Sequence, residues 1–315
     1  MNDVDLHASQ AARSTNEPLV ACVLVTWNSW KQTDRCLRAL FRQEYRKLEI
    51  IVVDNGSTDG TVQQLRSAYP SVICAENGYN AGFAKACNIG AGMGLERGAE
   101  YVWFLNNDTE APPETLAKIV TRAEGGPRVG IVGAVLRYMH DPSRVQAWGG
   151  GSISLWSGYN RHNTRPAALG SNAYITFASA LVRRQTFEQL GGLWEEIFLY
   201  FEDSDFSLRA TRTGWLLEVA EDTAILHAEG GSGANESRKS PLLQKIQTRS
   251  GVLFLRRHGR VPLISAAIFV ALRLGKRMAQ RDWDGLRGVL QGAAEGWRVR
   301  RSAIQQRGVR PQEIS

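Results

Sequence analysis

Short, continuous apolar runs alternate with stretches of helical spacing in the first half of this chain, and this alternation limits the possible folds more than any other feature. The apolar runs are Val20–Val25, Leu48–Val53, Val72–Ala75, Tyr101–Leu105 and Val129–Leu136. Such runs are typical of strands that are buried on both faces. Helices are expected between them, over about 33–43, from Thr61, in the stretch that leads to Leu95, and after Pro112–Pro113. The sequence therefore predicts an α/β fold with a Rossmann-like, mostly parallel central sheet flanked by helices.

Polar clusters follow three of the predicted strands, at Thr26–Asn28, Asp54–Gly56 and Asn106–Asp108. Ligands of parallel sheets bind beyond the carboxyl ends of the strands, so these clusters are expected to share one binding site. A dinucleotide site is not expected, because the turn after the first strand contains no glycine. The glycine run from Gly90 to Gly94 also has Leu95 where the third fingerprint glycine belongs.

Five motifs and a later histidine, His227, lie in order along the chain. The motifs are Val25-Thr26-Trp27-Asn28, Val53-Asp54-Asn55-Gly56-Ser57-Thr58-Asp59-Gly60-Thr61, Asn80-Ala81-Gly82-Phe83-Ala84, Leu105-Asn106-Asn107-Asp108 and Phe198-Leu199-Tyr200-Phe201-Glu202-Asp203-Ser204-Asp205-Phe206. Together they resemble glycosyltransferase family 2, which has the GT-A fold, and within it the rhamnosyltransferase-like branch. The resemblance covers about residues 19–233. It implies a nucleotide-sugar donor, a divalent metal (Mg²⁺ or Mn²⁺) and inversion at the anomeric carbon.

The resemblance and the composition together predict three regions. Residues 1–17 are polar and lack the basic and apolar segments of a signal peptide, so we expect a flexible N-terminal tail. Residues 18–240 are expected to form the GT-A catalytic domain, and residues 241–315 a basic helical extension. The four cysteines form no Cys-x-x-Cys pair and are expected to be reduced thiols of a cytoplasmic protein.

The donor-binding residues expected from the resemblance lie in the first four motifs. Asp54 would accept the imide N–H of a uracil or thymine base, although Asp-Asn-Gly is also a common turn sequence. Thr26 and Asn28 would lie near the nucleoside. The remaining residues expected beside the donor are Asn80, Gly82, Lys85, Asn106 and Asn107.

Asp108 and His227 are the expected metal ligands. One or two carboxylates suffice for a cation that is also bound by diphosphate, and imidazole is a competent ligand for Mn²⁺. Asn106 stands where the family has its first aspartate, which lowers the charge of the site. The alternative for Asp108 is a helix N-cap ahead of Pro112–Pro113, a task that Thr109 could perform instead.

Glu202 and Asp203 are the expected catalytic residues, and Glu202 and Trp148 are expected on the acceptor side. Inversion by direct displacement needs a carboxylate to take the proton of the acceptor hydroxyl, and the resemblance assigns this task to Asp203. Acids in the first turn of a helix also complement its dipole, but that explains one acid and not three. Asp205 is expected only to cap or to pair with Arg209, so that its loss would be mild.

The charge of the chain is concentrated near its end. Of the net +7, the segment from Arg238 to Ser315 carries +13, and the rest therefore carries −6. This segment contains the apolar stretch Val261–Leu274, which is too short to predict a membrane span. One interpretation is a helix packed on the catalytic domain with a solvated basic face. The other, which we favour, is an interfacial helix on an anionic membrane surface.

The sequence thus predicts an inverting glycosyltransferase that builds a bacterial surface glycan. The donor would be a dTDP- or UDP-sugar, with rhamnose as the first candidate, and the acceptor a glycan or a lipid-linked glycan. The enzyme would be peripheral on the inner face of the cytoplasmic membrane, with a homo-oligomer left open and no nucleic-acid partner. A nucleotidyltransferase and a non-catalytic nucleotide-sugar-binding protein remain as alternatives, the latter because of Asn106.

Overall fold

The computed structural model describes residues 17–228 and 240–304, so that all but Glu17 of the predicted tail lies outside the described residues. The strands are β1 (Val20–Thr26), β2 (Leu48–Asp54), β3 (Ile73–Glu76), β4 (Tyr101–Leu105), β5 (Thr109–Glu110), β6 (Val129–Tyr138), β7 (Asp141–Trp148), β8 (Gly150–Ile153), β9 (Asn160–His162), β10 (Ala173–Ile175), β11 (Ser179–Arg183) and β12 (Leu216–His227). The helices are α2 (Trp30–Leu40), α3 (Thr61–Ala68), α4 (Phe83–Glu96), α5 (Thr115–Glu124), α6 (Arg184–Leu190), α7 (Glu202–Arg212), α8 (Pro241–His258), α9 (Pro262–Ala279), α10 (Trp283–Arg298) and α11 (Arg301–Ile304).

The described strands form one twelve-stranded mixed sheet with the order β10-β8-β7-β6-β11-β4-β1-β2-β3, while β5, β9 and β12 pair off this path. The N-terminal strands are parallel, as the alternation predicted: β1 pairs with β2 and β4, and β2 with β3. Beyond β4 the sheet turns mainly antiparallel, because β11 runs against both β4 and β6, and β7 and β8 follow β6 through short connections. Such connections are too short for a parallel crossover.

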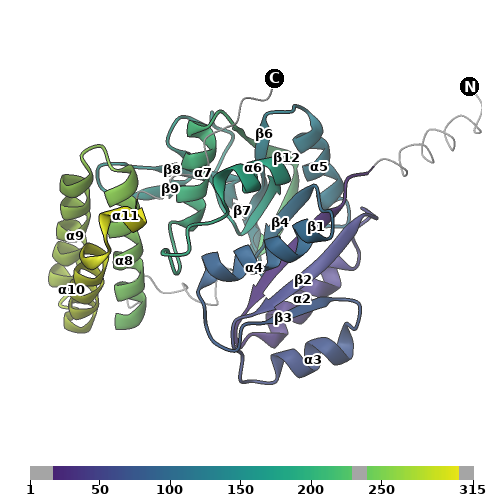
Figure 1. The fold of residues 1–315 in the computed structure, drawn as a ribbon, viewed down its shortest axis with the longest axis horizontal. Coiled ribbons are helices and arrows are strands. Elements are labelled where there is room, and N and C mark those ends of the chain that lie inside the picture. The colour runs from purple at the N-terminus through teal and green to yellow at the C-terminus, as the bar shows by residue number, and fades with distance from the viewer. Residues whose placement is uncertain (1–16, 229–239, 305–315) are drawn as a thin grey trace, which may run out of the picture.

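Helices cover both faces of the sheet (Figure 1). Alternate side chains of β1 point to opposite sides, as the pleat of a strand requires. Cys22 and Leu24 pack with α2, α3 and α5 on one face, whereas Ala21 and Val23 pack with α4, α6 and α7 on the other. The strands are therefore buried on both faces, which is why their sequences are uninterrupted apolar runs.

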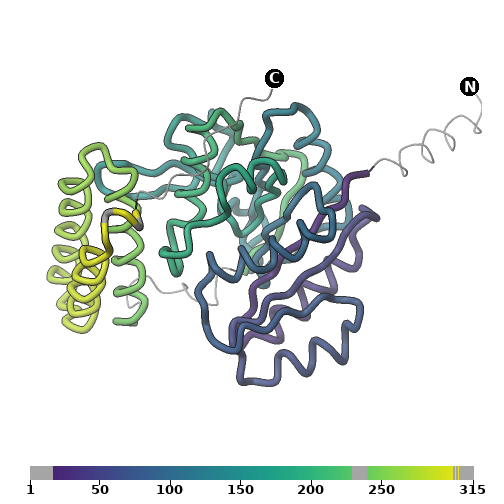
Figure 2. The backbone as a smooth tube through the Cα atoms, in the orientation of Figure 1, coloured from purple at the N-terminus to yellow at the C-terminus, as the bar shows by residue number. Residues whose placement is uncertain are grey.

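The described residues after 240 form four helices, and α8, α9 and α10 lie side by side at one flank of the molecule (Figures 1 and 2). Glycines on α10 allow its close approach to α8: a Cβ at Gly288 would lie 2.3 Å from the carbonyl oxygen of Pro241, and one at Gly292 would lie 2.2 Å from that of Lys245. A third hydrophobic cluster joins these helices to the part of the molecule that contains the sheet. It includes Phe201 at the start of α7, Phe254 from α8 and Phe269 from α9.

Candidate active site

Asp54 ends β2, and its two carboxylate oxygens have different surroundings. Oδ2 accepts hydrogen bonds from the backbone N–H groups of Gly56 (3.1 Å) and Ser57 (2.9 Å), which is the turn that the sequence offered as an alternative. Oδ1 is buried and has no hydrogen-bond partner within the described ranges. The side chain is 2% exposed. Because a buried acceptor without a partner is costly, Oδ1 remains suited to an N–H group from a ligand.

Asn28 joins the loops that follow β1 and β2. Its Oδ1 accepts from the backbone N–H of Thr58 (2.7 Å), and its own N–H donates to Oγ of Ser57 (2.8 Å). The residue has a φ of 49°, in the left-handed region that asparagine tolerates better than most residues. Asn28 therefore holds the turn of Asp54 in place from the neighbouring strand.

Thr26 and Asn107 meet in a polar network inside the protein. Nδ2 of Asn107 donates to Oγ of Ser29 (2.7 Å) and to Oγ1 of Thr33 (3.0 Å), and Oγ1 of Thr26 lies 2.9 Å from Oγ1 of Thr33. These contacts connect the ends of β1 and β4 to the first turn of α2. Both residues lie at the predicted strand ends, where their side chains are engaged with protein partners.

Asn55 organises the loop that contains Asn80 and Gly82, a role that the sequence analysis missed. Its Nδ2 donates to Oδ1 of Asn80 (3.1 Å) and to the carbonyl oxygen of Gly82 (3.3 Å), and its Oδ1 accepts from the N–H of Ala81 (3.1 Å). Gly82 has a φ of 87°, and a Cβ there would lie 2.7 Å from the ring of Phe198. Glycine is therefore required by both conformation and space.

Lys85 lies in the first turn of α4, at the rim of a cavity of about 870 Å³. Its Nζ donates to the hydroxyl of Tyr79 (3.2 Å), and this hydrogen bond raises the pKa of Lys85. The cavity lies between the 190–198 segment and the start of α8, and it is lined by apolar residues such as Trp194, Phe198 and Leu242 together with charged side chains. Nε1 of Trp194 is buried without a partner among the described residues.

Asp108 and His227 are brought together although 119 positions separate them in the sequence. The cause is the antiparallel pairing of β5 with β12, which places Thr109 opposite His227. Oδ1 of Asp108 lies 3.1 Å from Nε2 of His227. The helix N-cap considered for Asp108, or for Thr109 in its place, is not found: α5 begins only at Thr115 with Glu114 as its N-cap residue, and the Thr109 hydroxyl donates to the carbonyl oxygen of Asn106 (2.7 Å).

Two amides determine how the ring of His227 presents its nitrogens. Nδ1 lies 2.8 Å from Oε1 of Gln146, so it carries the proton and donates it to that oxygen. Nε2 then accepts from Nδ2 of Asn106 (3.3 Å). The lone pair of Nε2 and Oδ1 of Asp108 are thus two acceptors that face each other, and a cation between or beside them would relieve the repulsion. The pair fits a divalent metal whose other ligands are diphosphate oxygens or waters.

No group of three or more histidine, cysteine and acidic side chains with the geometry of a metal site occurs within the described ranges. Gln146 on β7 was not predicted as a site residue. It lies 81 positions before His227, and a glutamine in a strand of mixed polarity gives no local signal of this role.

Glu202 and Asp203 open α7 after an unusual backbone turn. The two preceding residues, Tyr200 and Phe201, have φ values of 69° and 72°, in a region that bulky residues rarely adopt. Burial raises the pKa of Glu202 to about 8, the neighbouring charge of Asp203 adds to the rise, and Oε2 of Glu202 has no partner among the described residues. Burial also raises the pKa of Asp203 to about 6, although its Oδ1 accepts from the N–H of Ser204 (2.6 Å). Strained backbone and shifted carboxyl groups together are typical of a catalytic position.

Asp205 has a different environment from its two acidic neighbours. It is fully buried, and it pairs with Arg209 (2.8 Å) on its own helix and with Arg257 (3.2 Å) and His258 (2.8 Å) on α8. Burial alone would raise the pKa of Asp205, but Arg209 and His258 hold it well below its usual range. The expectation that Asp205 only caps or pairs with Arg209 is therefore wrong, because the cations on α8 could not be seen from the local sequence.

Trp148 ends β7 and packs against the cluster that contains α4 and α7. Its indole Nε1 is buried and has no partner among the described residues. Tyr174 on β10, which the sequence analysis did not single out, is buried, and the charge of Asp203 contributes to the raised pKa of its hydroxyl. Trp148 and Tyr174 belong to separate hydrophobic clusters, and each of these clusters also contains residues of α7.

Several characterised proteins share sequence or fold with this chain. An N-acetylglucosaminyl-diphospho-decaprenol L-rhamnosyltransferase of Mycobacterium tuberculosis is 28% identical over 236 residues, which cover 67% of this chain and 76% of the relative. The dTDP-rhamnosyl transferase RfbF of Shigella flexneri is 26% identical over 251 residues, covering 78% and 82%.

Solved structures with a similar fold include the mannosyltransferase PcManGT of Pyrobaculum calidifontis in complex with GDP-Man and Mn²⁺ (TM-score 0.53, 21% identity, 92% of each chain). GalNAc-T7 with UDP, GalNAc and Mn²⁺ superposes with a TM-score of 0.63 at 14% identity, over 89% of this chain and 55% of that one. These likenesses establish the GT-A fold. The model of the family described as Glycosyl transferase family 2 matches residues 21–191. Because residues 21–191 are more than half of the 315 residues of the chain, the chain belongs to glycosyltransferase family 2.

Proposed function

We propose that this protein is a metal-dependent, inverting glycosyltransferase that transfers a sugar, with rhamnose as the first candidate, from a dTDP- or UDP-sugar to an acceptor hydroxyl. The observation that carries the proposal is the contact between Oδ1 of Asp108 and Nε2 of His227, 3.1 Å apart at the strand ends. Two acceptors held at this distance are suited to share a cation. Rhamnose is preferred because the two curated relatives described above are named rhamnosyltransferases.

The donor would lie across the ends of β1, β2 and β4. Oδ1 of Asp54 would accept the imide N–H of the base, which would satisfy a buried oxygen that has no partner within the described ranges. Asn28, Asn80 and Gly82 would contact the nucleoside, and Lys85 would face its phosphates. Thr26 and Asn107 would support this surface from below, since their side chains bond to α2, and Asn106 would orient His227.

Asp108 and His227 would hold the metal, with Gln146 fixing the orientation of the imidazole. When bound, a divalent cation neutralises the charge of the departing diphosphate, so no general acid is required for that group. The protein contributes the two ligands and a rigid β5–β12 pairing that keeps them at one distance. Asn106 contributes an amide in place of a carboxylate, which leaves the site less negative than the family's pattern implies.

Asp203 would remove the proton of the acceptor hydroxyl as it attacks the anomeric carbon. A base with a pKa of about 6 is mostly ionised at neutral pH, and yet it binds a proton more readily than an ordinary aspartate. Glu202, with a pKa of about 8, would be largely protonated and could donate a hydrogen bond to the acceptor. Trp148 would present its face and its unused N–H to the acceptor sugar.

The biological setting is also part of the proposal. We propose a glycan or lipid-linked acceptor in bacterial surface polysaccharide synthesis, because the mycobacterial relative is named for a diphospho-decaprenol substrate. All four cysteines are free, and Cys22, Cys36 and Cys87 are buried, as expected for a reducing cytoplasm. The enzyme would act at the inner face of the cytoplasmic membrane, as a monomer or a homo-oligomer, and without a nucleic acid.

The proposal is tested with a panel of nucleotide sugars, measured by thermal shift with and without Mn²⁺ and followed by a transfer assay. A ligand at about 100 times its dissociation constant stabilises the fold by about 2.7 kcal/mol. Metal-dependent binding of a dTDP- or UDP-sugar, and release of the nucleoside diphosphate, support the proposal. Formation of pyrophosphate from a sugar phosphate and a nucleoside triphosphate would identify a nucleotidyltransferase instead. Binding without any turnover, with all acceptors tried, would identify a non-catalytic binding protein.

A further inference from the structure

Helix α9 is unusual for a surface helix because its outer face is largely apolar, while its inner face buries an arginine beside Ala266 and Phe269. Its inner face buries Arg277, which is 4% exposed, and holds Arg273 in hydrogen bonds to Thr248 (2.9 Å) and Gln244 (2.6 Å) on α8. Its outer face exposes Leu263 by 62% and Leu272 by 59%. A helix whose outer face meets water is expected to present polar side chains on that face instead of leucine and isoleucine.

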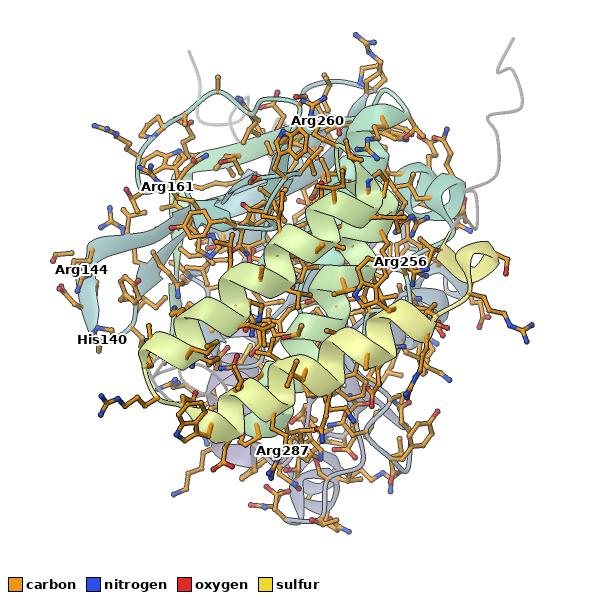
Figure 3. The ribbon with its side chains drawn as sticks, turned by 90° about the vertical axis from the view of Figure 1, so that its left-hand side faces the viewer. His140, Arg144, Arg161, Arg256, Arg260 and Arg287 are labelled. Carbon is orange, nitrogen blue, oxygen red and sulfur yellow. The ribbon has the colours of Figure 1, made fainter. Side chains whose placement is uncertain are left out.

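The exposed apolar positions of α9 form one continuous stripe. Leu263, Ile264, Ile268 and Leu272 follow one another at helical spacing, and Ala267 and Ala271 fill the positions between them. On the neighbouring α10 the large exposed apolar side chains are Trp283, Leu290 and Trp297. Figure 3 shows α9 and α10 side by side on one face of the molecule. We name the outer side of these two helices the α9–α10 face.

Basic residues surround the α9–α10 face. Figure 3 shows Arg260 beyond one end of α9, Arg287 on α10, and Arg161 and Arg144 on strands to one side. All four side chains are exposed. Exposed acidic residues are sparse on these helices: of their acids, Asp282 pairs with Arg277 and Glu295 with Lys245, which leaves Asp284 at the start of α10. The face therefore combines an apolar centre with a positive border.

An apolar centre with a positive border is complementary to the surface of an anionic bilayer, whose interior accepts leucine and whose head groups attract arginine. Tryptophans at both ends of α10 fit the interfacial layer, where their rings partition. No helix within the described ranges is long and apolar enough to cross a membrane, so α9 would lie along the surface. We propose that the α9–α10 face docks this protein on an anionic lipid membrane.

The docking face is joined directly to the start of the catalytic helix. The ring of Phe269, on the inner side of α9, lies edge-on to the ring of Phe201 at 5.9 Å, and Phe201 precedes Glu202. Ser250 on α8 donates to the carbonyl oxygen of Leu199 (2.8 Å), in the same turn. A docked face thus fixes α7 relative to the bilayer. This inference deepens the proposed function and rests on it for the identity of the acceptor. A lipid-linked acceptor would reach the active site from the membrane to which the α9–α10 face is bound, with Asp203 held in a fixed orientation.

The test uses the full chain and vesicles of phosphatidylcholine with or without phosphatidylglycerol, and measures flotation over a range of salt concentrations. We expect binding only with the anionic lipid, and weaker binding as salt screens the charges. The triple change Leu263→Gln, Ile268→Gln and Leu272→Gln should lower the bound fraction at least about tenfold, because it removes most of the apolar stripe. The matched control is Phe41→Gln with Leu216→Gln, two exposed apolar residues of the catalytic domain, which should bind like wild type.

A second pair of variants tests the border. Arg260→Gln with Arg287→Gln should weaken binding by about tenfold or more at low salt, since each basic residue near such a surface contributes about 1 kcal/mol. The control variant is Arg42→Gln with Arg46→Gln, two exposed arginines that are not part of α9 or α10. This variant should bind the vesicles like wild type. Wild-type protein that never floats refutes the docking face. So does a wild-type dimer that the triple change converts to a monomer without any lipid effect, because the face would then serve self-association.

Donor hydrolysis in vesicle-free solution separates this inference from the proposed function. The triple variant should keep wild-type hydrolysis and thermal stability, which shows that its fold and donor site are intact. If the wild type floats but never turns over a nucleotide sugar, the proposed function fails and the docking face stands. If it turns over the donor but never floats, the docking face fails alone.

Discussion

Nε2 of His258 donates a hydrogen bond to Oδ1 of Asp205 across 2.8 Å, and both side chains are buried between α7 and α8. The other ring nitrogen of His258, Nδ1, accepts from Arg212 at 2.6 Å. The imidazole therefore carries a single proton, in agreement with the lowering of its pKa, which results mainly from burial. Through this contact the first turn of α7 is held by the last turn of α8.

Asp205→Asn is expected to destabilise the protein strongly. The change leaves Arg209 and Arg257, whose side chains are only 11% and 14% exposed, without the buried carboxylate. Removal of one partner from a buried ion pair typically costs about 3–5 kcal/mol. Urea denaturation measures the loss. Asp203→Asn is the control, and it should keep nearly the wild-type stability. Equal stability of Asp205→Asn and wild type would contradict the role assigned to this cluster.

Asp203→Asn is expected to impair the chemical step and to spare donor binding. The amide keeps the shape of the side chain but cannot take the hydroxyl proton, so kcat should fall by at least about 100-fold. The donor Kd, measured by calorimetry, should stay within about twofold, because the base contacts the acceptor and not the nucleotide. A variant with near-wild-type kcat would show that another group is the base.

The pH dependence of kcat/KM is expected to show an acidic limb at about pH 6. Burial raises the pKa of Asp203 to about 6, so below that pH the base is protonated and inactive. Activity should rise as pH increases through 6 and then level off. The residual activity of Asp203→Asn should lack this limb. If kcat/KM of the wild type does not change between about pH 5 and 7, Asp203 is not the general base.

Glu202→Gln is expected to stabilise the protein at alkaline pH. The pKa of Glu202 is raised in the folded state, from its ordinary value of 4.5 to about 8, so between these values the unfolded chain releases a proton that the folded chain keeps. The free energy of unfolding therefore decreases with rising pH across this window, and glutamine removes that loss. The Tm difference between Glu202→Gln and wild type should be largest near pH 8 and should shrink toward pH 4.5. A Tm difference between the two proteins that does not depend on pH would contradict the raised pKa of Glu202.

Gln146→Leu is expected to raise the metal concentration needed for half-maximal activity by about 10–100-fold, the usual effect of losing the residue that orients a histidine ligand. The affected contact is the 2.8 Å hydrogen bond to Nδ1 of His227. His227→Ala should have a larger effect in the same direction, and Asp108→Ala should abolish turnover. Asn106→Asp is the opposite control: the added carboxylate should lower the metal requirement. Full activity of Asp108→Ala in excess EDTA would refute a metal site here.

The parallel half of the sheet was predictable from sequence, because a strand that is buried on both faces needs an apolar residue at every position. In the antiparallel half only β6 was predicted, from the apolar run Val129–Leu136. β8, β9 and β10 are three or four residues long, and their partners are chosen by tertiary contacts. The C-terminal helix α9 extends from 262 to 279, five residues beyond the predicted apolar stretch, because its last turns bury Arg277 against the other helices.

The strand-end motifs correctly placed Asp54 at the end of β2 and Asp108 in the turn that follows β4, since local turn and strand signals fix those positions. Residues that act by joining distant segments gave no such signal. Gln146 reaches His227 only through the curl of the sheet, and Arg257 reaches Asp205 only after α8 has docked. For the same reason three neighbouring acids looked alike in the sequence, whereas the structure separates two with raised pKa values from one in an ion-pair cluster.

The two consecutive left-handed residues before α7 have a consequence for how this enzyme can be divided. Tyr200 and Phe201 keep a conformation that costs of order 1–3 kcal/mol each, and the rings of Phe254 and Phe269 hold Phe201 in it. A gene fragment that stops at Ser240 would lack both rings and two of the partners of Asp205, Arg257 and His258. Exchange of C-terminal segments between homologues should therefore give a folded protein only when Phe201, Phe254 and Phe269 come from the same homologue. The segment that must be kept together is therefore longer than the 21–191 range of the family model.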